Sequence, residues 1–209
     1  MKINEIFLSI QGESLSVGLP TVFVRFTGCN LRCSYCDTTY AYHDGYDMSL
    51  DDIISVIDTM GYKRVCLTGG EPLLQPDIQN LIDRLNGYDV SIETNGSVAL
   101  QQFHLHPGQR FVMDIKLISS GCYNSMKLDN FNHLSDNDEI KFVVCDRTDY
   151  ELAKEIIHKY YKQGKILISP VFDTIDYATV VEWMLTDRLN ARFQLQIHKI
   201  IWDKNRRGV

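Results

Sequence analysis

The sequence contains no run of 18 apolar residues, and the opening segment from Met1 to Glu5 does not have the layout of a secretory signal peptide. We therefore expect a cytosolic protein. Blocks rich in lysine or arginine are also lacking: Lys204–Arg207 near the C-terminal end is the only one, and the net charge is −6. This composition does not indicate a nucleic-acid-binding surface, so small-molecule chemistry is the better expectation.

Internal repeats, low-complexity tracts and linker-like segments are absent as well. With 209 residues, of which 44% are hydrophobic, the chain can bury a sizeable core. We expect a single domain spanning residues 1–209.

The chain has six cysteines, which in a reducing compartment are better interpreted as metal ligands or buried thiols than as a disulfide framework. Cys66 and Cys145 belong to apolar runs and are expected to be buried, whereas Cys122 follows a glycine in a loop. Their roles are not assigned by the sequence.

The other three cysteines form a compact triplet, Cys29, Cys33 and Cys36. A four-iron cluster normally takes four thiolates, so three suggest a cluster with one iron left open to bind a ligand. The alternative is a structural zinc site made of the triplet and His43, because zinc accepts three cysteines and one histidine. The triplet alone leaves both interpretations open.

Strand-like apolar runs alternate with helix-like periodicity along the chain, which predicts an α/β fold with a mostly parallel sheet. Residues 97–109 and 119–137 are less regular, and there are too few elements for eight units. We therefore expect a shortened, incomplete (β/α) barrel. Strands are predicted at 22–26, 64–67, 90–93, 111–114, 140–144, 166–169 and 193–196, and helices from Ser49 to Met60, from Asp77, over 149–163 with Gly164 as the stop, and over 178–188.

Polar clusters follow the predicted strands, at the ends where ligands bind in parallel α/β folds. Five polar segments each follow a predicted strand, so we expect these segments to lie together at one rim of the sheet. The segments are Thr27–Cys29, Thr68–Pro72, Glu93–Gly96, Asp114–Lys116 and Ser169–Val171.

Two of these segments also permit ordinary structural interpretations. Gly69-Gly70 would let backbone amides approach a ligand, but the pair could equally form a simple turn between a strand and a helix. Glu71 would add a hydrogen-bond acceptor, and Pro72 would restrict the backbone that follows the turn. Glu93 at a strand end is either solvated or committed to a ligand, because an unpaired buried carboxylate is costly.

The cysteine spacing, the aromatic Tyr35, the Gly69–Pro72 motif and the Glu93–Gly96 segment together resemble the radical S-adenosylmethionine (SAM) superfamily. The resemblance implies a [4Fe-4S] cluster whose open iron binds S-adenosyl-L-methionine. Reductive cleavage of that cofactor would give a 5′-deoxyadenosyl radical, so the cofactor carries the difficult chemistry and the protein orients it.

The two ends of the chain resemble one family in that superfamily, the 7-carboxy-7-deazaguanine synthases. The segments that carry this resemblance are Glu5–Ser14, Phe23–Cys29, Cys36–Thr38 and Gln196–Trp202. It implies ring contraction of 6-carboxy-5,6,7,8-tetrahydropterin to 7-carboxy-7-deazaguanine, a step toward queuosine and other 7-deazapurines. Ammonia would be lost and S-adenosylmethionine regenerated.

The resemblance also implies roles for individual residues. Cys29, Cys33 and Cys36 would hold the cluster, and Thr38 would supply an oxygen to Mg²⁺. The pterin would contact Ile10, Gln11, Gly12, Glu13, Arg25, Thr68, His198 and the terminal Val209, with Arg25 on its carboxylate. The cofactor would contact Tyr35, Cys36, Asp37, Thr38, Gly69, Gly70, Glu71, Glu93, Asp114, Lys116, Ser169, Pro170, Val171 and Phe172.

The resemblance further implies a homodimer and an electron donor such as flavodoxin. One departure from the family pattern is Ser14, where the family usually has glycine, so the turn there is expected to differ slightly. Another is the segment between the cysteines and the first long helix, which is shorter than in many relatives. Two rival functions are a glycyl-radical activating enzyme with the same cluster and a zinc-stabilised binding module without catalysis.

Overall fold

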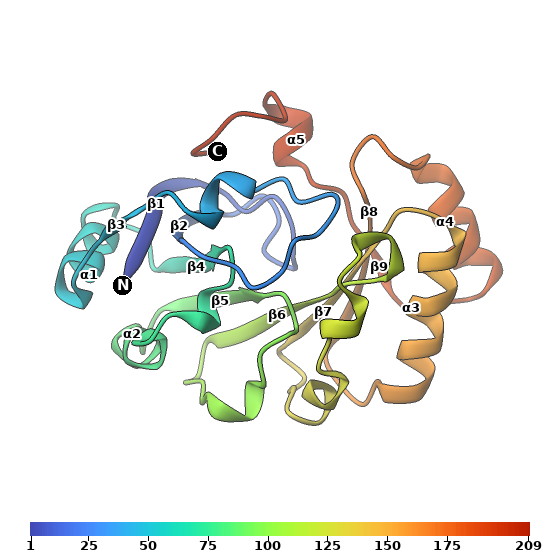
Figure 1. The fold of residues 1–209 in the computed structure, drawn as a ribbon, viewed down its shortest axis with the longest axis horizontal. Helices are drawn as coiled ribbons and strands as arrows, with labels where there is room; N and C mark the ends of the chain where they lie inside the picture. Colours follow the sequence, from blue (N-terminus) through green and yellow to red (C-terminus); the bar gives the residue numbers. More distant parts are fainter.

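The computed structural model describes all residues, 1–209, and contains one nine-stranded sheet with the order β3-β1-β2-β4-β5-β6-β7-β8-β9 (Figure 1). Neighbouring strands from β2 to β9 are parallel, whereas β1 is antiparallel to both β2 and β3. The strands are β1 (Lys2–Ile10), β2 (Pro20–Phe26), β3 (Tyr46–Asp47), β4 (Arg64–Gly69), β5 (Asp89–Thr94), β6 (Gln109–Ile115), β7 (Glu139–Val144), β8 (Lys165–Pro170) and β9 (Arg192–Phe193).

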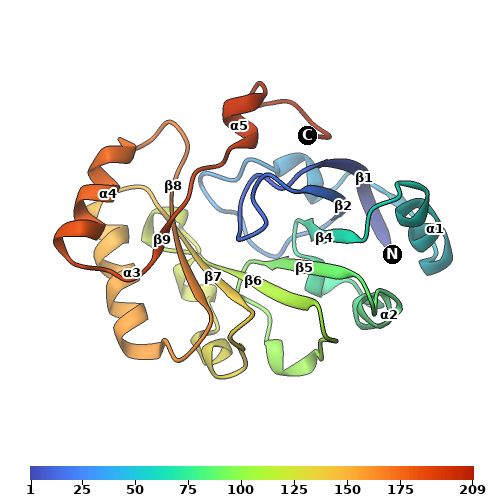
Figure 2. The same cartoon turned by 180° about the vertical axis from the view of Figure 1, so that it is seen from behind.

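The sheet does not close, because the outer strands β3 and β9 do not pair with each other. This confirms the expected shortened, incomplete barrel of mostly parallel strands. Figures 1 and 2 show α1 and α2 near one end of the sheet, α3 and α4 near the other, and α5 with the C-terminus above the middle. The helices are α1 (Leu50–Thr59), α2 (Ile78–Arg84), α3 (Arg147–Tyr160), α4 (Tyr177–Thr186) and α5 (His198–Ile201).

The helices begin where the sequence provides caps and bury their apolar faces. Ser49 accepts a hydrogen bond from the backbone N–H of Asp52 at the start of α1, and Ile53 and Ile57 of that helix are fully buried. Between β5 and β6 and between β6 and β7 the chain forms only short 3₁₀ turns. The irregular middle predicted from the sequence therefore lacks two of the helices that a complete barrel would have.

Two predicted boundaries are wrong. The helix predicted over 149–163 is α3, which ends at Tyr160, because Tyr161 is already extended and leads toward β8. Gly164 does not stop this helix but lies in the following turn, with φ of +100°. The strand predicted over 193–196 is only the two-residue β9, because the chain then leaves the sheet and carries Gln196 toward Glu13.

One contiguous core of 32 buried residues links the strands to the helices that cover them. Because the strands supply alternate side chains to this core, their carboxyl ends are held in register at one rim. Cys66 of β4 is fully buried as expected, whereas Cys145 is half-buried, and all six thiols are free. No helix is long and apolar enough to cross a membrane.

Candidate active site

A cavity of about 800 Å³ lies at the carboxyl ends of the parallel strands. All five segments predicted to share a rim reach its wall, through residues such as Cys29, Gly70, Glu93, Asp114 and Val171. The side chains thus come together because parallel strands end at the same edge of the sheet. The β1 end and the C-terminal tail complete the wall.

The cysteine loop, residues 28–38, follows β2 and brings Cys29, Cys33 and Cys36 to the cavity. The Cys29 sulfur accepts hydrogen bonds from the backbone N–H of Leu31 at 3.4 Å and from the Asn95 amide at 3.7 Å. Donors of this kind stabilise ligating sulfurs and tune cluster potentials. The donor set and its surroundings fit a three-cysteine iron–sulfur cluster.

The ligands of the alternative zinc site are not gathered at zinc-binding distances in this structure. Zinc needs its ligands close together, since Zn–S bonds are about 2.3 Å long. The triplet and His43 do not form a group whose ligand atoms all lie within 4.8 Å of one another. The one group that does is Asp83, His104 and His106, on α2 and the segment before β6, and none of these residues lines the cavity.

Gly69 and Gly70 allow the end of β4 to lie directly against β2 and the cysteine loop. A Cβ at Gly69, whose φ is +139°, would collide with the backbone of Phe26, and one at Gly70 would collide with the Gly28 carbonyl. Both glycines line the cavity. The two interpretations of this pair are therefore compatible, because the same glycines form the turn and bring the backbone to the cavity.

Glu71 does not face the cavity as the sequence interpretation required. It is fully buried, and its carboxylate accepts hydrogen bonds from the backbone of Leu73 and Asn95 and from the Thr94 hydroxyl. Burial raises the pKa of Glu71 to about 7, although these donors oppose the rise. Ser169 and Pro170 also lie outside the cavity wall.

Glu93 lies between two residues predicted to bind the substrate. Gln11 donates to one Glu93 oxygen at 3.3 Å, and the Thr68 hydroxyl donates to the other at 3.1 Å. The three side chains extend from the ends of β1, β4 and β5 into the cavity. This geometry groups Glu93 with the predicted substrate residues rather than with the predicted cofactor residues.

Arg25 of β2 points a partly free guanidinium into the cavity. Its Nε donates to Glu5 at 2.8 Å, while its two terminal nitrogens have no protein acceptor. The side chain lies between the rings of Phe7 and Tyr40, each about 5.8 Å from the guanidinium carbon. A guanidinium held in this way is suited to bind a carboxylate through two hydrogen bonds.

Glu13 is held by two residues that were not among the predicted site residues. Lys141 donates to one Glu13 oxygen at 2.7 Å, and Gln196 donates to the other at 2.6 Å. Burial opposes ionisation of Glu13, but the charge and hydrogen bond of Lys141 lower its pKa to about 2. A lysine between Ile140 and Phe142 in a strand was the available signal, since alternation places it on the face opposite to the core.

Asp114 and Lys116 form an ion pair of 2.8 Å at the end of β6. The second carboxylate oxygen of Asp114 is buried without any hydrogen-bond partner, and so is the Tyr35 hydroxyl. Buried polar atoms normally have partners, so these two atoms suit a polar ligand. They flank the predicted cofactor region, where Val171 and Phe172 also line the wall.

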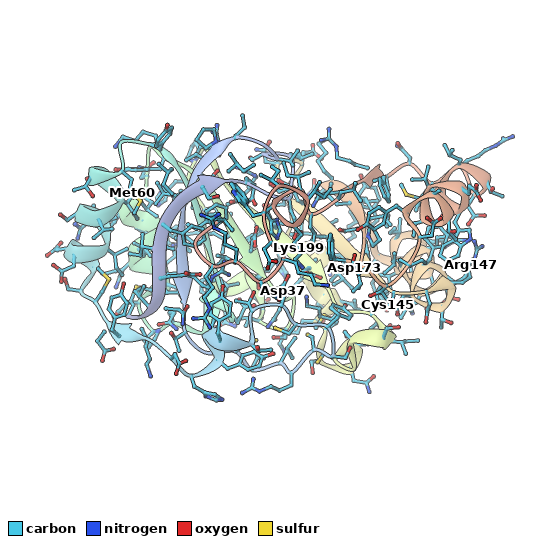
Figure 3. The ribbon with its side chains drawn as sticks, turned by 90° about the horizontal axis from the view of Figure 1, so that it is seen from above. Asp37, Met60, Cys145, Arg147, Asp173 and Lys199 are labelled. Atoms are coloured by element: carbon cyan, nitrogen blue, oxygen red, sulfur yellow. The ribbon has the colours of Figure 1, made fainter.

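The C-terminal tail covers the cavity and is anchored at the cysteine loop. Lys199 of α5 donates to Asp37 at 2.5 Å, and Figure 3 shows the two residues next to each other when the molecule is seen from above. Gly12 accepts a backbone hydrogen bond from Ile197, and a Cβ at Gly12 would collide with the His198 ring. His198 and Val209, which the resemblance placed at the substrate, both line the cavity.

Thr38 also lines the cavity and donates a hydrogen bond to Asp37 at 2.9 Å. Ile10 is another lining residue of the cavity. Apart from Glu71, Ser169 and Pro170, the structure therefore brings the predicted site residues together around one cavity. It adds Lys141 and Gln196 to them.

Comparisons with known proteins agree with this geometry. The model of the radical SAM superfamily matches residues 23–184, and that superfamily implies a [4Fe-4S] cluster and S-adenosylmethionine. The crystal structure of QueE from Escherichia coli is 26% identical, with a TM-score of 0.76, and the match covers 93% of this chain and 92% of that one.

Two relatives are similar over their whole length. A 7-carboxy-7-deazaguanine synthase of Clostridium acetobutylicum is 45% identical over 100% of this chain and 99% of its own. Another, from Koribacter versatilis, is 37% identical, and the match covers 100% of both chains. The chain therefore belongs to the 7-carboxy-7-deazaguanine synthase family of the radical SAM superfamily.

Proposed function

We propose that this chain, acting as one radical SAM domain, converts 6-carboxy-5,6,7,8-tetrahydropterin to 7-carboxy-7-deazaguanine with loss of ammonia. The observation that carries the proposal is the shared cavity, which joins the cysteine loop to a set of carboxylate, amide and guanidinium groups. An enzyme that places a radical source next to a polar heterocycle needs both in one enclosed space.

On the cofactor side, Cys29, Cys33 and Cys36 would hold the cluster. Bound S-adenosylmethionine would supply the radical that starts the rearrangement. The unpartnered Asp114 oxygen would accept from a sugar hydroxyl, and Lys116 would face the carboxylate of the cofactor. Val171 and Phe172 would close over the adenine and exclude water.

On the substrate side, Arg25 would bind the pterin carboxylate through its terminal nitrogens. Glu13 would accept hydrogen bonds from the amino and ring N–H groups of the pterin, because an ionised carboxylate is an acceptor only. Gln11, Thr68 and Glu93 would pair with the remaining polar edge. His198 and Val209 would enclose the substrate from above.

Mg²⁺ is proposed at Thr38, where the hydroxyl and the substrate carboxylate would both be available as oxygen ligands. Turnover should fall when Mg²⁺ is chelated and recover when Mg²⁺ is added back. A Thr38→Ala variant should need more Mg²⁺ for half-maximal rate, while its iron content stays normal. An unchanged Mg²⁺ requirement in this variant would remove Thr38 from the metal site.

Two partners are also proposed, a reducing protein such as flavodoxin and a second copy of this chain. Residues 5–10 of β1 pair only with β2, and exposed Leu8, Leu15 and Leu19 lie on β1 and the adjoining loop. An uncovered strand edge with apolar neighbours is suited to dimerisation. Light scattering should give twice the chain mass, and a Leu8→Asp variant should lower it.

The main test is anaerobic reconstitution followed by turnover. About four irons per chain with broad visible absorption supports the cluster, while a colourless protein with stoichiometric zinc would identify a zinc module. The reduced enzyme should release 7-carboxy-7-deazaguanine in excess of the S-adenosylmethionine consumed. A Cys33→Ala variant is the control and should make no product.

The rival activating enzyme predicts a different outcome. It would leave the pterin unchanged and would cleave S-adenosylmethionine only with a protein substrate. The tail anchored over the cavity through Lys199 and Asp37 argues against it, because a protein substrate needs an open face.

A further inference from the structure

We propose that Lys141 is the positioning residue of the pterin site, which keeps Glu13 ionised and aimed at the substrate and joins it to Asp114 on the cofactor side. The inference rests on the proposed function, because it assumes that Glu13 accepts hydrogen bonds from a pterin. It concerns a residue with no assigned role in that function.

Lys141 lies between the two halves of the site. Its ammonium group donates to Glu13 at 2.7 Å and lies 3.4 Å from the Asp114 carboxylate, which also binds Lys116 at 2.8 Å. The side chains of Lys141, Glu13 and Asp114 are each only 12 to 15% exposed. Lys141 therefore links β1, β6 and β7 at the cavity wall.

The charge of Lys141 compensates acidic groups on several elements. Glu13 follows β1, Glu93 belongs to β5 and Asp114 to β6, and His198 faces Glu13 from the tail. A buried carboxylate without a nearby cation takes up a proton instead of staying charged. Removing the Lys141 charge would therefore shift Glu13 toward its protonated form, since His198 is half-buried and its pKa is lowered by burial.

The hydrogen bonds also set the orientation of Glu13. Lys141 engages one carboxylate oxygen and Gln196 the other, so the group is held at both ends. Each oxygen has a further lone pair that can accept a hydrogen bond from a ligand. A protonated Glu13 would present a donor where the amino group and ring N–H of the pterin need acceptors, so pterin binding should weaken.

The probe is oxidised pterin-6-carboxylate, which does not react. Fluorescence quenching measures its binding to the reconstituted enzyme between pH 5.5 and 8.5. Lys141→Met should weaken binding roughly 10- to 100-fold at pH 6, with partial recovery at pH 8.5, because Glu13 then ionises again. Lys141→Arg keeps the charge and should retain most of the affinity. Lys154→Met, at a half-buried, ion-paired lysine of α3 outside the cavity, is the matched control and should bind like the unaltered enzyme.

A double-mutant cycle separates positioning from general damage to the fold. If Lys141 acts through Glu13, the double variant Lys141→Met, Glu13→Gln should bind the probe about as weakly as Glu13→Gln alone. The loss of affinity at low pH that is specific to Lys141→Met should be absent from the double variant. Additive losses, or a Lys141→Met variant with unchanged affinity and pH profile, would overturn the inference. The double variant also removes both charges of the pair, so it should fold even if the single variant is unstable.

The outcomes for the proposed function are distinct. An unaltered enzyme that binds the probe but makes no deazaguanine would refute the ring contraction and leave the Lys141 cycle interpretable. An enzyme that makes the product but shows additive Lys141 and Glu13 effects would refute only the positioning role. S-adenosylmethionine cleavage by the reduced Lys141→Met enzyme provides a separate check on the cofactor side, and its loss would contradict an effect exerted through Glu13.

Discussion

Two buried polar residues near the cavity, Glu71 and Ser14, hydrogen-bond to the backbone. Glu71 satisfies two backbone N–H groups and one hydroxyl, although its motif predicted a ligand contact. Ser14 occupies a left-handed position, with φ of 69°, and its hydroxyl accepts from the buried N–H of Ser16. Ser14 is therefore a strained serine that is held in the turn by its hydrogen bond.

Two variants of Ser14 allow the cost of its backbone strain to be compared with the stabilisation from its hydrogen bond. Ser14→Gly should be nearly neutral, because relief of about 1 kcal/mol of backbone strain offsets the lost hydrogen bond of similar size. Ser14→Ala keeps the strain and loses the bond, so it should cost about 1 to 2 kcal/mol in the free energy of unfolding. Urea unfolding measures both, and equal losses would contradict this balance.

Glu71 should make the stability of the protein depend on pH near neutrality. Its folded-state pKa of about 7 lies above the ordinary value of 4.5, so the folded state holds a proton that the unfolded state has released. Its stabilising contribution is complete below pH 4.5 and is lost as the pH rises through 7, by roughly 3 kcal/mol in all.

Urea unfolding of the metal-free protein from pH 5 to 8 measures how the free energy of unfolding changes with pH. Glu71→Gln should be less stable at pH 5, because its amide N–H₂ cannot accept the bonds that the carboxyl accepts, but its free energy of unfolding should change less with pH. Parallel curves for the two proteins would show that another group titrates.

Among the elements, α5 depends most on tertiary contacts. Four residues are too few to form a stable helix alone, since helix nucleation is unfavourable. The contacts that hold it come from Asp37, Glu13 and Gly12. The cover over the cavity is therefore only as stable as those contacts.

Lys199 and Lys204 provide a matched pair in the tail. Lys199 is 11% exposed and binds Asp37, whereas Lys204 is 55% exposed and binds Asp173. Lys199→Met should speed amide exchange in residues 197–209, while Lys204→Met should have little effect, because exposed ion pairs contribute little. Equal exchange rates in the two variants would show that Lys199 does not anchor the tail.

Gly12 sets how closely the tail approaches β1. Gly12→Ala should displace His198 and raise the KM for the pterin several-fold, with little change in iron content, because the added methyl group occupies the position of the imidazole. Steady-state kinetics and an iron assay measure the two effects. Loss of iron in this variant would indicate a wider disturbance than the tail.

At the scale of the whole molecule, the core and the cysteine loop are separate. The 32-residue core lies in the sheet and its helices, and none of the cluster cysteines belongs to it. Replacing Cys29, Cys33 and Cys36 together by alanine should abolish iron binding but leave the unfolding midpoint close to that of the metal-free unaltered protein. Iron assay and far-ultraviolet circular dichroism test this, and an unfolded variant would show that the loop supports the fold.

The sequence by itself determined the order of the parallel strands and of helices α1 to α4, the thiolate triplet and the common rim, but not β1, β3 or α5. Those features follow from local information, because strand and helix periodicity, caps and cysteine spacing are all encoded over a few residues. Even the irregular middle and the incomplete barrel could be predicted, since both reflect missing periodicity. Element ends were less predictable, as α3 and β9 show, because packing decides where a chain leaves regular structure.

Only the tertiary structure decided which polar residues meet. Lys141 pairs with Glu13 across 128 positions, and Gln196 reaches the same carboxylate across 183. It also placed Glu71 inside the protein and brought Glu93 into hydrogen-bonding contact with Gln11 and Thr68. The physical reason is that charge pairing and burial depend on distance in space, which the sheet order and the returning tail set, and which no local pattern of residues contains.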